Sequence, residues 1–221
     1  MNFGIASLRR WLAGAARQDV RAAAAERWVV IDTETAGLDP DRDPLLAIVG
    51  VAVDGDGIRL DDSFEVLVRS APAGDAANIV VHGIGHAAQA AGMNAPAALA
   101  RFRAWAADSP RVGFHVDFDR AVLRNACARA GIPDDDAPWL DLAPLAAAFA
   151  PDAYRRGGRS LDDWLAAFGI ECSLRHNAAA DALATAELLL RLRARGARQG
   201  RVGFDALVRT ARQQKGLGAD S

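Results

Sequence analysis

The sequence has 221 residues, 51% hydrophobic and 24% charged, which is typical of a globular protein with a sizeable core. Its formal net charge of −2 excludes a strongly basic protein, so binding to nucleic acid would need a local patch. Cys127 and Cys172 form no CxxC motif and indicate isolated thiols in a reducing compartment. The N-terminal apolar run is interrupted by Arg9 and Arg10, and no run reaches the length of a membrane span. We therefore expect a cytoplasmic protein without a membrane partner.

The predicted elements alternate between strands and helices after an early antiparallel meander. An Ala- and Arg-rich segment near the N-terminus is expected to be helical, and a loop is expected at 151–160. The predicted strands are 28–31, 45–53, 58–68, 112–114 and 139–142. The predicted helices are 95–107, 118–130, 161–168, 178–195 and 204–212, with Gly169 and Gly196 as helix-ending residues. This order predicts an α/β fold, with a mixed sheet and helices around it.

Two acids follow the first predicted strand in the stretch VVIDTETAGLDP (29–40). Asp32 and Glu34 are two residues apart, so in an extended chain their side chains point to the same face. Carboxylates held that close repel each other unless a cation lies between them. The open alternatives are a metal ion, a basic partner, or a solvated strand end without function.

Further candidates lie in two later stretches. Asp119, in FHVDFDRAVL (114–123), lies where a short strand is followed by a helix, and the alternative for it is a helix cap. His176 precedes Asp181 by five residues in HNAAADALATAELLL (176–190), so the two would not share a helical face. They can converge only if Asn177 caps the helix and His176 lies on the loop before it.

These three stretches, in this order and at these intervals, resemble the 3′–5′ exonucleases whose active site has four acids and a histidine. The closest likeness is to the epsilon-type proofreading exonucleases of bacterial DNA polymerase III and their stand-alone relatives. VHGIG (81–85) matches a minor signature of the family, but His115-Val-Asp replaces its usual His-Asn-Ala and leaves Asp117 as an additional acid. The resemblance implies a ribonuclease H-like fold, a mixed five-stranded sheet flanked by helices. The expected parts are an N-terminal helical extension (1–27), the exonuclease domain (28–195) and a basic C-terminal tail with a short helix (196–221).

The resemblance also implies two Mg²⁺ or Mn²⁺ ions, hard cations that prefer carboxylate oxygens. Asp32 would bridge both ions, Glu34 and Asp181 would complete the first site, and Asp119 would hold the second. His176 would take the proton from the attacking water, for which a pKa near neutrality is suited.

The substrate-binding residues implied by the resemblance are Thr35 and Leu38, which would meet the terminal nucleotide. His82 either contacts the substrate or caps a turn. Asp141, at the end of a predicted strand, is expected to support the next helix. The arginines after residue 190 form either a solvated face or a guide for a nucleic-acid strand.

The expected function is metal-dependent hydrolysis at the 3′ end of single-stranded DNA, releasing nucleoside 5′-monophosphates in proofreading or repair. The alternatives are a 3′–5′ exoribonuclease that trims RNA ends or short oligoribonucleotides, and a non-catalytic nucleic-acid-binding module. QGRVGF (199–204) resembles the peptide by which epsilon-type subunits contact the sliding clamp, which would make a polymerase or clamp a partner. The favoured interpretation of Gln199–Phe204 is a loop that leads into the last helix.

Overall fold

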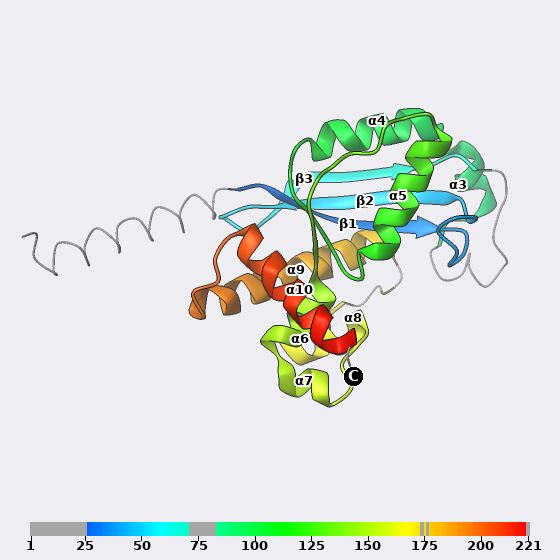
Figure 1. Ribbon diagram of the computed structural model, residues 1–221. Helices are drawn as coiled ribbons and strands as arrows, with labels where there is room; N and C mark the ends of the chain where they lie inside the picture. Colours follow the sequence, from blue (N-terminus) through cyan, green and yellow to red (C-terminus); the bar gives the residue numbers. More distant parts are fainter. Residues whose placement is uncertain (1–25, 71–82, 173–174, 176, 220–221) are drawn as a thin grey trace, which may run out of the picture.

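A five-stranded mixed sheet forms the centre of the computed structural model, which describes residues 26–70, 83–172, 175 and 177–219 (Figure 1). The strands are β1 Trp28–Thr35, β2 Leu45–Val53, β3 Ile58–Leu67, β4 Arg111–Gly113 and β5 Trp139–Asp141. Their order across the sheet is β3-β2-β1-β4-β5. The β1–β2 and β2–β3 pairs are antiparallel, whereas β4 pairs in parallel with both β1 and β5. The mixed sheet expected from the sequence is confirmed.

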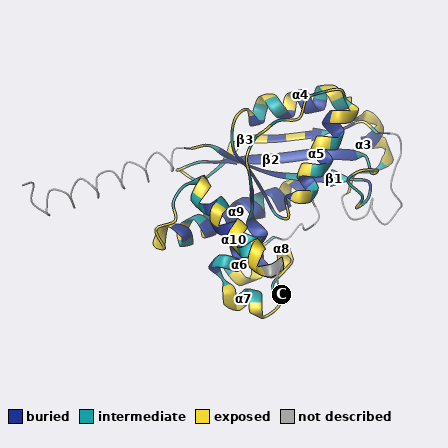
Figure 2. Ribbon diagram, in the orientation of Figure 1, coloured by how far each residue is buried: buried dark blue, intermediate teal, exposed yellow. Residues whose placement is uncertain are grey.

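Burial along the strands follows their place in the sheet. Every residue of β2, LLAIVGVAV, is buried, because helices cover both of its faces (Figure 2). The edge strand β3 instead alternates near its end, where Phe64 and Val66 are buried and Ser63 and Glu65 are exposed. The hydrophobic pattern therefore distinguishes the central strand from the edge strand and indicates which face of the edge strand is exposed to solvent.

Helices pack on both faces of the sheet. They are α3 His86–Ala91, α4 Ala95–Ala106, α5 Asp117–Arg129, α6 Leu142–Phe149, α7 Pro151–Arg155, α8 Leu161–Phe168, α9 Ala178–Arg198 and α10 Phe204–Ala219. Side chains of α4 and α5 pack against Val29 and Ile31 of β1. Those of α6, α8, α9 and α10 pack against Trp28 and Val30. These four helices lie on the opposite face of the sheet (Figure 1). The alternation along β1 thus divides the core into two layers.

Three helices differ from the sequence-based prediction. α3 and α6 were not expected, and α7 lies inside the segment predicted as a loop, 151–160. The α6 sequence, LAPLAAAF, is apolar almost throughout, so it has no helical periodicity that would distinguish it from a buried strand. α3 and α7 have six and five residues, too few for a periodic pattern.

The two glycines predicted to end helices behave differently. Gly169 ends α8 in the left-handed conformation, with φ of 64°, as predicted. Gly196 does not end α9, which continues to Arg198. A Cβ at Gly196 would lie 2.8 Å from the Arg201 carbonyl oxygen and 3.0 Å from Leu207 Cδ2. Glycine is used there for close packing against the start of α10.

The C-terminal helix α10 packs against α6 and β5. At its first residue, the Phe204 ring meets the Trp28 ring edge-on at 5.3 Å, and Phe204 is 6% exposed. The segment QGRVGF is therefore the turn between two packed helices, and its phenylalanine belongs to the core. The predicted N-terminal helix, 5–26, lies almost entirely outside the described residues. Within the described ranges, no helix is long and apolar enough to cross a membrane.

Candidate active site

Asp32 and Glu34 lie near the end of β1, on the face of the sheet that α9 covers. Asp32 pairs with Val49 of β2, and Val49 packs against Ala178 and Ala182 of α9. These two alanines are small, so the helix approaches the strand ends closely. The register of β1 against β2 shifts directly after Glu34, an irregularity that redirects side chains at a strand end. Both carboxylates are only partly exposed.

Asp119 reaches β1 from the first turn of α5. The backbone N–H and the hydroxyl of Thr33 both donate to Asp119 Oδ1, at 3.0 and 2.6 Å. Asp119 is 6% exposed, and no side chain caps the N-terminus of α5. The Asp119 carboxylate is therefore held by Thr33, the residue between Asp32 and Glu34 in β1. It is not a simple cap of α5, which was the alternative.

Asp181 lies in the first turn of α9 and is 9% exposed. Asn177 caps this helix as predicted, since its side chain accepts a hydrogen bond from the Ala180 N–H at 3.1 Å. The Ala178 N–H donates to the Glu34 carboxylate, so the N-terminus of α9 also faces the acids of β1. His176, the expected general base, and His82, the expected substrate contact, lie outside the described residues.

The electrostatics show that the four acids of the three motifs share one site. Burial raises the pKa of Asp32 well above its usual range, and the charges of Asp119, Glu34 and Asp181 raise it further. Burial and the charges of Asp181 and Asp119 raise the pKa of Glu34 to about 7. Burial also raises the pKa of Asp119 to about 7, against the effect of the Thr33 hydrogen bonds. Such mutual shifts are typical of carboxylates held close together.

Arg175 supplies positive charge to this cluster. Its guanidinium donates to Asp181 and to Asp162 of α8, and its charge lowers the pKa of Asp32. Asp181 is thus already engaged. Accordingly, no group of three or more His, Cys, Asp or Glu side chains in the described part of the chain is arranged as a ready metal site.

The expected substrate-binding residues Thr35 and Leu38 lie at the end of β1 and just beyond it. The Thr35 hydroxyl donates to the Gly37 carbonyl, which shapes the turn after the strand. Leu38 is 91% exposed, an unusual state for a leucine.

Asp141 supports the next helix, as expected. Its Oδ1 accepts the N–H of Ala143, which caps α6, and the N–H of His115, each at 3.0 Å. His115 has a positive φ of 57°, a strained conformation that this hydrogen bond helps to hold. The additional acid Asp117 forms an ion pair with Lys215 of α10 at 2.6 Å.

A model of the RNase T family, described as exonuclease, matches residues 29–189, which include the first two motifs and all but the last residue of the third. The chain belongs to this exonuclease family. The resemblance inferred from the motifs is thereby confirmed, and with it the expectation that the chain is an enzyme of this class.

Sequence similarity to a bacterial relative extends over most of this chain. It is 32% identical, over 196 residues, to the DNA polymerase III subunit epsilon-like protein of Rhodobacter capsulatus. That match covers 87% of this chain but 27% of the relative, so the chain spans about a quarter of that protein's length.

Two solved structures share the fold. One is E. coli exonuclease I with a dT13 oligonucleotide, with a TM-score of 0.66 and 23% identity over 79% of this chain and 42% of that one. The other is the zinc-bound form of the E. coli exonuclease I–single-stranded DNA complex, with a TM-score of 0.65 and 23% identity over 78% of this chain and 42% of that one. This likeness confirms the ribonuclease H-like fold expected from the motifs.

Two residues of the site were not anticipated from the sequence. Thr33 lies between Asp32 and Glu34 and faces the opposite side of β1, where it meets Asp119. Its position between the two acids of the first motif was the available signal. Arg175 directly precedes His176, and a basic residue next to the motif that contains Asp181 was the signal for it.

The arginines after residue 190 include three that pack on the core. The guanidinium groups lie over aromatic rings in the pairs Arg193–Trp28, Arg195–Phe168 and Arg201–Phe149. Arg193 and Arg195 also donate to backbone carbonyls. Arg193 and Arg195 are thus half-buried, so they do not form a fully solvated face.

Proposed function

We propose that this chain is a metal-dependent 3′–5′ exonuclease that removes nucleoside 5′-monophosphates from the 3′ end of a single strand. The observation that carries the proposal is the convergence of Asp32, Glu34, Asp119 and Asp181, from β1, α5 and α9, on one end of the sheet. A non-catalytic module of the same fold would have no need to keep four mutually repelling carboxylates in a partly buried cluster.

The donor set fits divalent cations. All four side chains offer carboxylate oxygens, which favour hard ions such as Mg²⁺ and Mn²⁺. Asp32, Glu34 and Asp181 would hold one ion, and Asp119 with Asp32 a second. When bound, two such ions stabilise the negative charge on the attacking and leaving oxygens of a phosphodiester. Asp181 can serve as a ligand only after its ion pair with Arg175 is broken.

The chain's own groups have separate tasks in this proposal. The two bonds from Thr33 hold the Asp119 carboxylate in one orientation, and the Ala178 N–H orients Glu34. His176 would accept the proton of the attacking water. Leu38 and Thr35 would place the terminal nucleotide at the exposed turn after β1.

Single-stranded DNA is the substrate that the comparisons favour. The related E. coli exonuclease I was solved with a dT13 oligonucleotide, and the Rhodobacter relative is named for a polymerase subunit. We therefore propose a role in proofreading or repair of DNA. Selection against a 2′-hydroxyl depends on pocket shape rather than on the motifs, so RNA is the alternative substrate.

The test uses DNA and RNA strands of one sequence, labelled at either the 5′ or the 3′ end, with Mg²⁺, Mn²⁺ or EDTA. The proposal predicts that 3′-labelled DNA loses its label as a mononucleotide while 5′-labelled DNA gives a descending ladder, both only with metal. Faster trimming of RNA would reassign the substrate. Release from the 5′ end, or unchanged release in EDTA, would contradict the proposal.

A further inference from the structure

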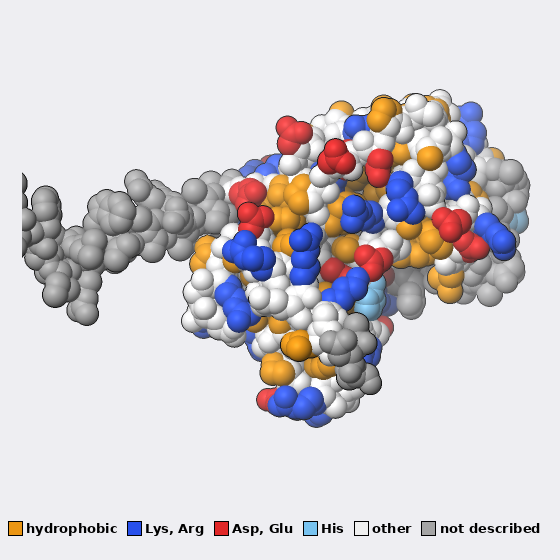
Figure 3. All heavy atoms as spheres, viewed as in Figure 1, with side chains coloured by type: hydrophobic (Ala, Val, Ile, Leu, Met, Phe, Trp, Pro, Cys, Tyr) orange, Lys and Arg blue, Asp and Glu red, His pale blue; other side chains and the backbone are white. Residues whose placement is uncertain are grey.

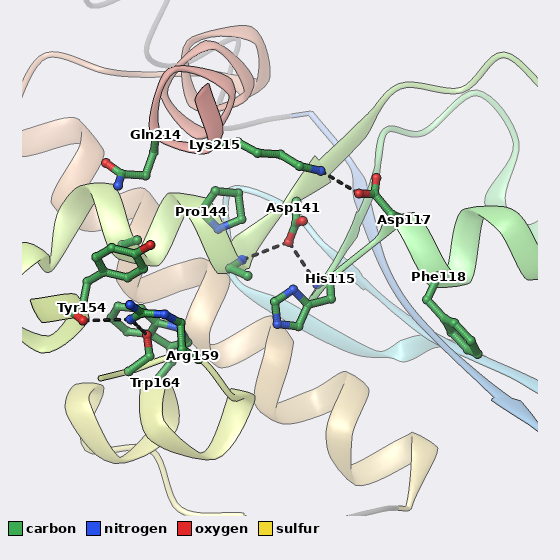
Figure 4. Close-up of a pocket in the computed structure, with 13 residues that line it drawn as sticks. His115, Asp117, Phe118, Asp141, Pro144, Tyr154, Arg159, Trp164, Gln214 and Lys215 are labelled. Atoms are coloured by element: carbon green, nitrogen blue, oxygen red, sulfur yellow. Dashed lines mark hydrogen bonds and ion pairs between the residues drawn. The ribbon is translucent and has the colours of Figure 1, made fainter. Parts of the chain in front are cut away.

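A cavity of about 610 Å³ opens beside the candidate active site, between the start of α5, the end of β5, and α6, α7, α8 and α10 (Figure 4). Its wall is partly apolar, with Phe118, Pro144 and the Tyr154 ring among the lining groups. Asp141 also lines it, and the charge of Asp141 raises the pKa of Asp119. The cavity is therefore a neighbour of the catalytic carboxylates, although it contains none of them.

The cavity continues into a groove along α10. A depression of about 130 Å³ shares Asp141 and Lys215 with the cavity. A third depression, of about 410 Å³, shares Arg120, Trp139 and Arg212 with the second. Because neighbouring depressions share lining residues, they adjoin one another along α10, and we call the three together the α10 groove.

Three cations of the α10 groove have no side-chain partner among the residues that the structure describes. Arg120 of α5 and Arg209 and Arg212 of α10 are exposed, and none makes a hydrogen bond or ion pair through its side chain with another described residue. In the space-filling view, Lys and Arg side chains gather over α10 and α5 (Figure 3). These arginines differ from those packed on core rings, since their guanidinium groups remain available for an anion.

The groove also has acidic groups, and the two nearest the active site are already satisfied. Asp117 pairs with Lys215, and Asp141 accepts two backbone N–H groups (Figure 4). Asp136 and Asp205 line the far depression beside Arg209. The middle of the groove, at Arg120 and Arg212, is thus where an incoming phosphate finds positive charge.

We propose that the α10 groove binds the part of a single nucleic-acid strand that lies 5′ to the scissile bond. This proposal rests on the function proposed above. Phosphates would lie at Arg120 and Arg212, and bases would enter the apolar cavity beside Phe118 and Tyr154. Cations that follow the backbone and rings on which bases stack are the two features that single-strand sites share.

The test compares a long and a minimal substrate with the double variant Arg120→Ala/Arg212→Ala. The matched control is Arg101→Ala/Arg198→Ala, which removes two exposed cations outside the groove lining. For a 12-nucleotide strand, KM should rise about tenfold in the groove variant while kcat stays within twofold. Hydrolysis of the p-nitrophenyl ester of thymidine 5′-monophosphate, which is too short to reach Arg120 and Arg212, should be unchanged.

Strand binding in EDTA provides a readout that does not depend on catalysis. The slope of log affinity against log salt should decrease by about 1.4 in the groove variant, since each lost phosphate contact on a single strand removes about 0.7. An unchanged slope and KM, or an equal change in the control variant, would overturn the groove proposal. Absence of hydrolysis in the wild type, with the slope difference intact, would instead overturn the proposed catalytic function.

Discussion

Thr33 donates two hydrogen bonds, at 3.0 and 2.6 Å, to the same oxygen of Asp119, and so joins the central strand to the start of α5. Both residues are buried, so the bonds are shielded from water. They fix the carboxylate that the second motif contributes to the site. Thr33 lies between Asp32 and Glu34 in the sequence, but its side chain faces the other side of β1. From there it positions a third candidate, Asp119.

Thr33→Val keeps the shape of the side chain and the backbone bond but removes the hydroxyl donor. Because Asp119 loses its shorter hydrogen bond, exonuclease activity should fall about 10- to 100-fold, the effect of losing a group that orients a metal ligand. The free energy of unfolding should fall by about 0.5–1.5 kcal/mol, the net contribution of one hydrogen bond, because the same oxygen still accepts the Thr33 N–H. Thr33→Ser, which keeps the donor, should lie close to wild type in both kcat and Tm. Full activity in the valine variant would show that this bond does not position Asp119.

The raised pKa of Glu34, about 7, predicts a pH dependence of stability in the metal-free protein. A carboxyl whose pKa is higher when folded contributes stability below its unfolded pKa, and this is lost as pH rises through the folded pKa. The Tm of Glu34→Gln minus that of wild type should therefore increase from pH 5 to pH 8 in EDTA. Saturating Mn²⁺ at pH 8 should raise the wild-type Tm and reduce the difference. A difference independent of pH would contradict the charge crowding described for this site.

The motif acids and the early antiparallel strand pair were predictable from the sequence, because both depend on local spacing. Asp32 and Glu34 share a face by strand geometry, and Asn177 caps α9 because its side chain suits that position.

The remaining features depend on contacts between segments far apart in the sequence. The all-apolar α6 lacks a periodic signal, and Gly196 marks a close helix approach rather than a helix end. Arg175 acquires its role only when α8 and α9 bring Asp162 and Asp181 to it. The α10 groove exists because a C-terminal helix returns to the start of α5, which no local pattern indicates.

Arg175→Gln tests the competition between this arginine and a metal ion. Since the guanidinium pairs with Asp181, its removal should lower the Mn²⁺ concentration for half-maximal activity several-fold. The metal-free protein should have a lower Tm, because the carboxylates lose their cation. Asp162→Asn removes only the outer partner and is the control. A higher metal requirement in Arg175→Gln would show that the arginine assists the site instead.

Phe204→Ala separates core packing from a clamp-binding peptide. Phe204 is 6% exposed and contacts Trp28, so its truncation should reduce the free energy of unfolding by about 3–5 kcal/mol. Gln199→Ala, in the same segment, should leave stability unchanged. If Gln199→Ala alone abolishes capture by a sliding clamp, QGRVGF serves as a clamp peptide in spite of the burial of its phenylalanine.

The most direct test of the account is the metal-dependent hydrolysis of a 3′-labelled strand by Asp32→Asn at saturating Mn²⁺. Asp32 lies within the field of the other three acids, and its replacement removes the proposed shared ligand while preserving shape. The account predicts a fall in kcat of at least about 10³-fold, with the fold retained and the metal-free Tm equal to or above that of wild type. Retention of more than a tenth of wild-type activity would contradict the assignment of this carboxylate cluster as the catalytic metal site.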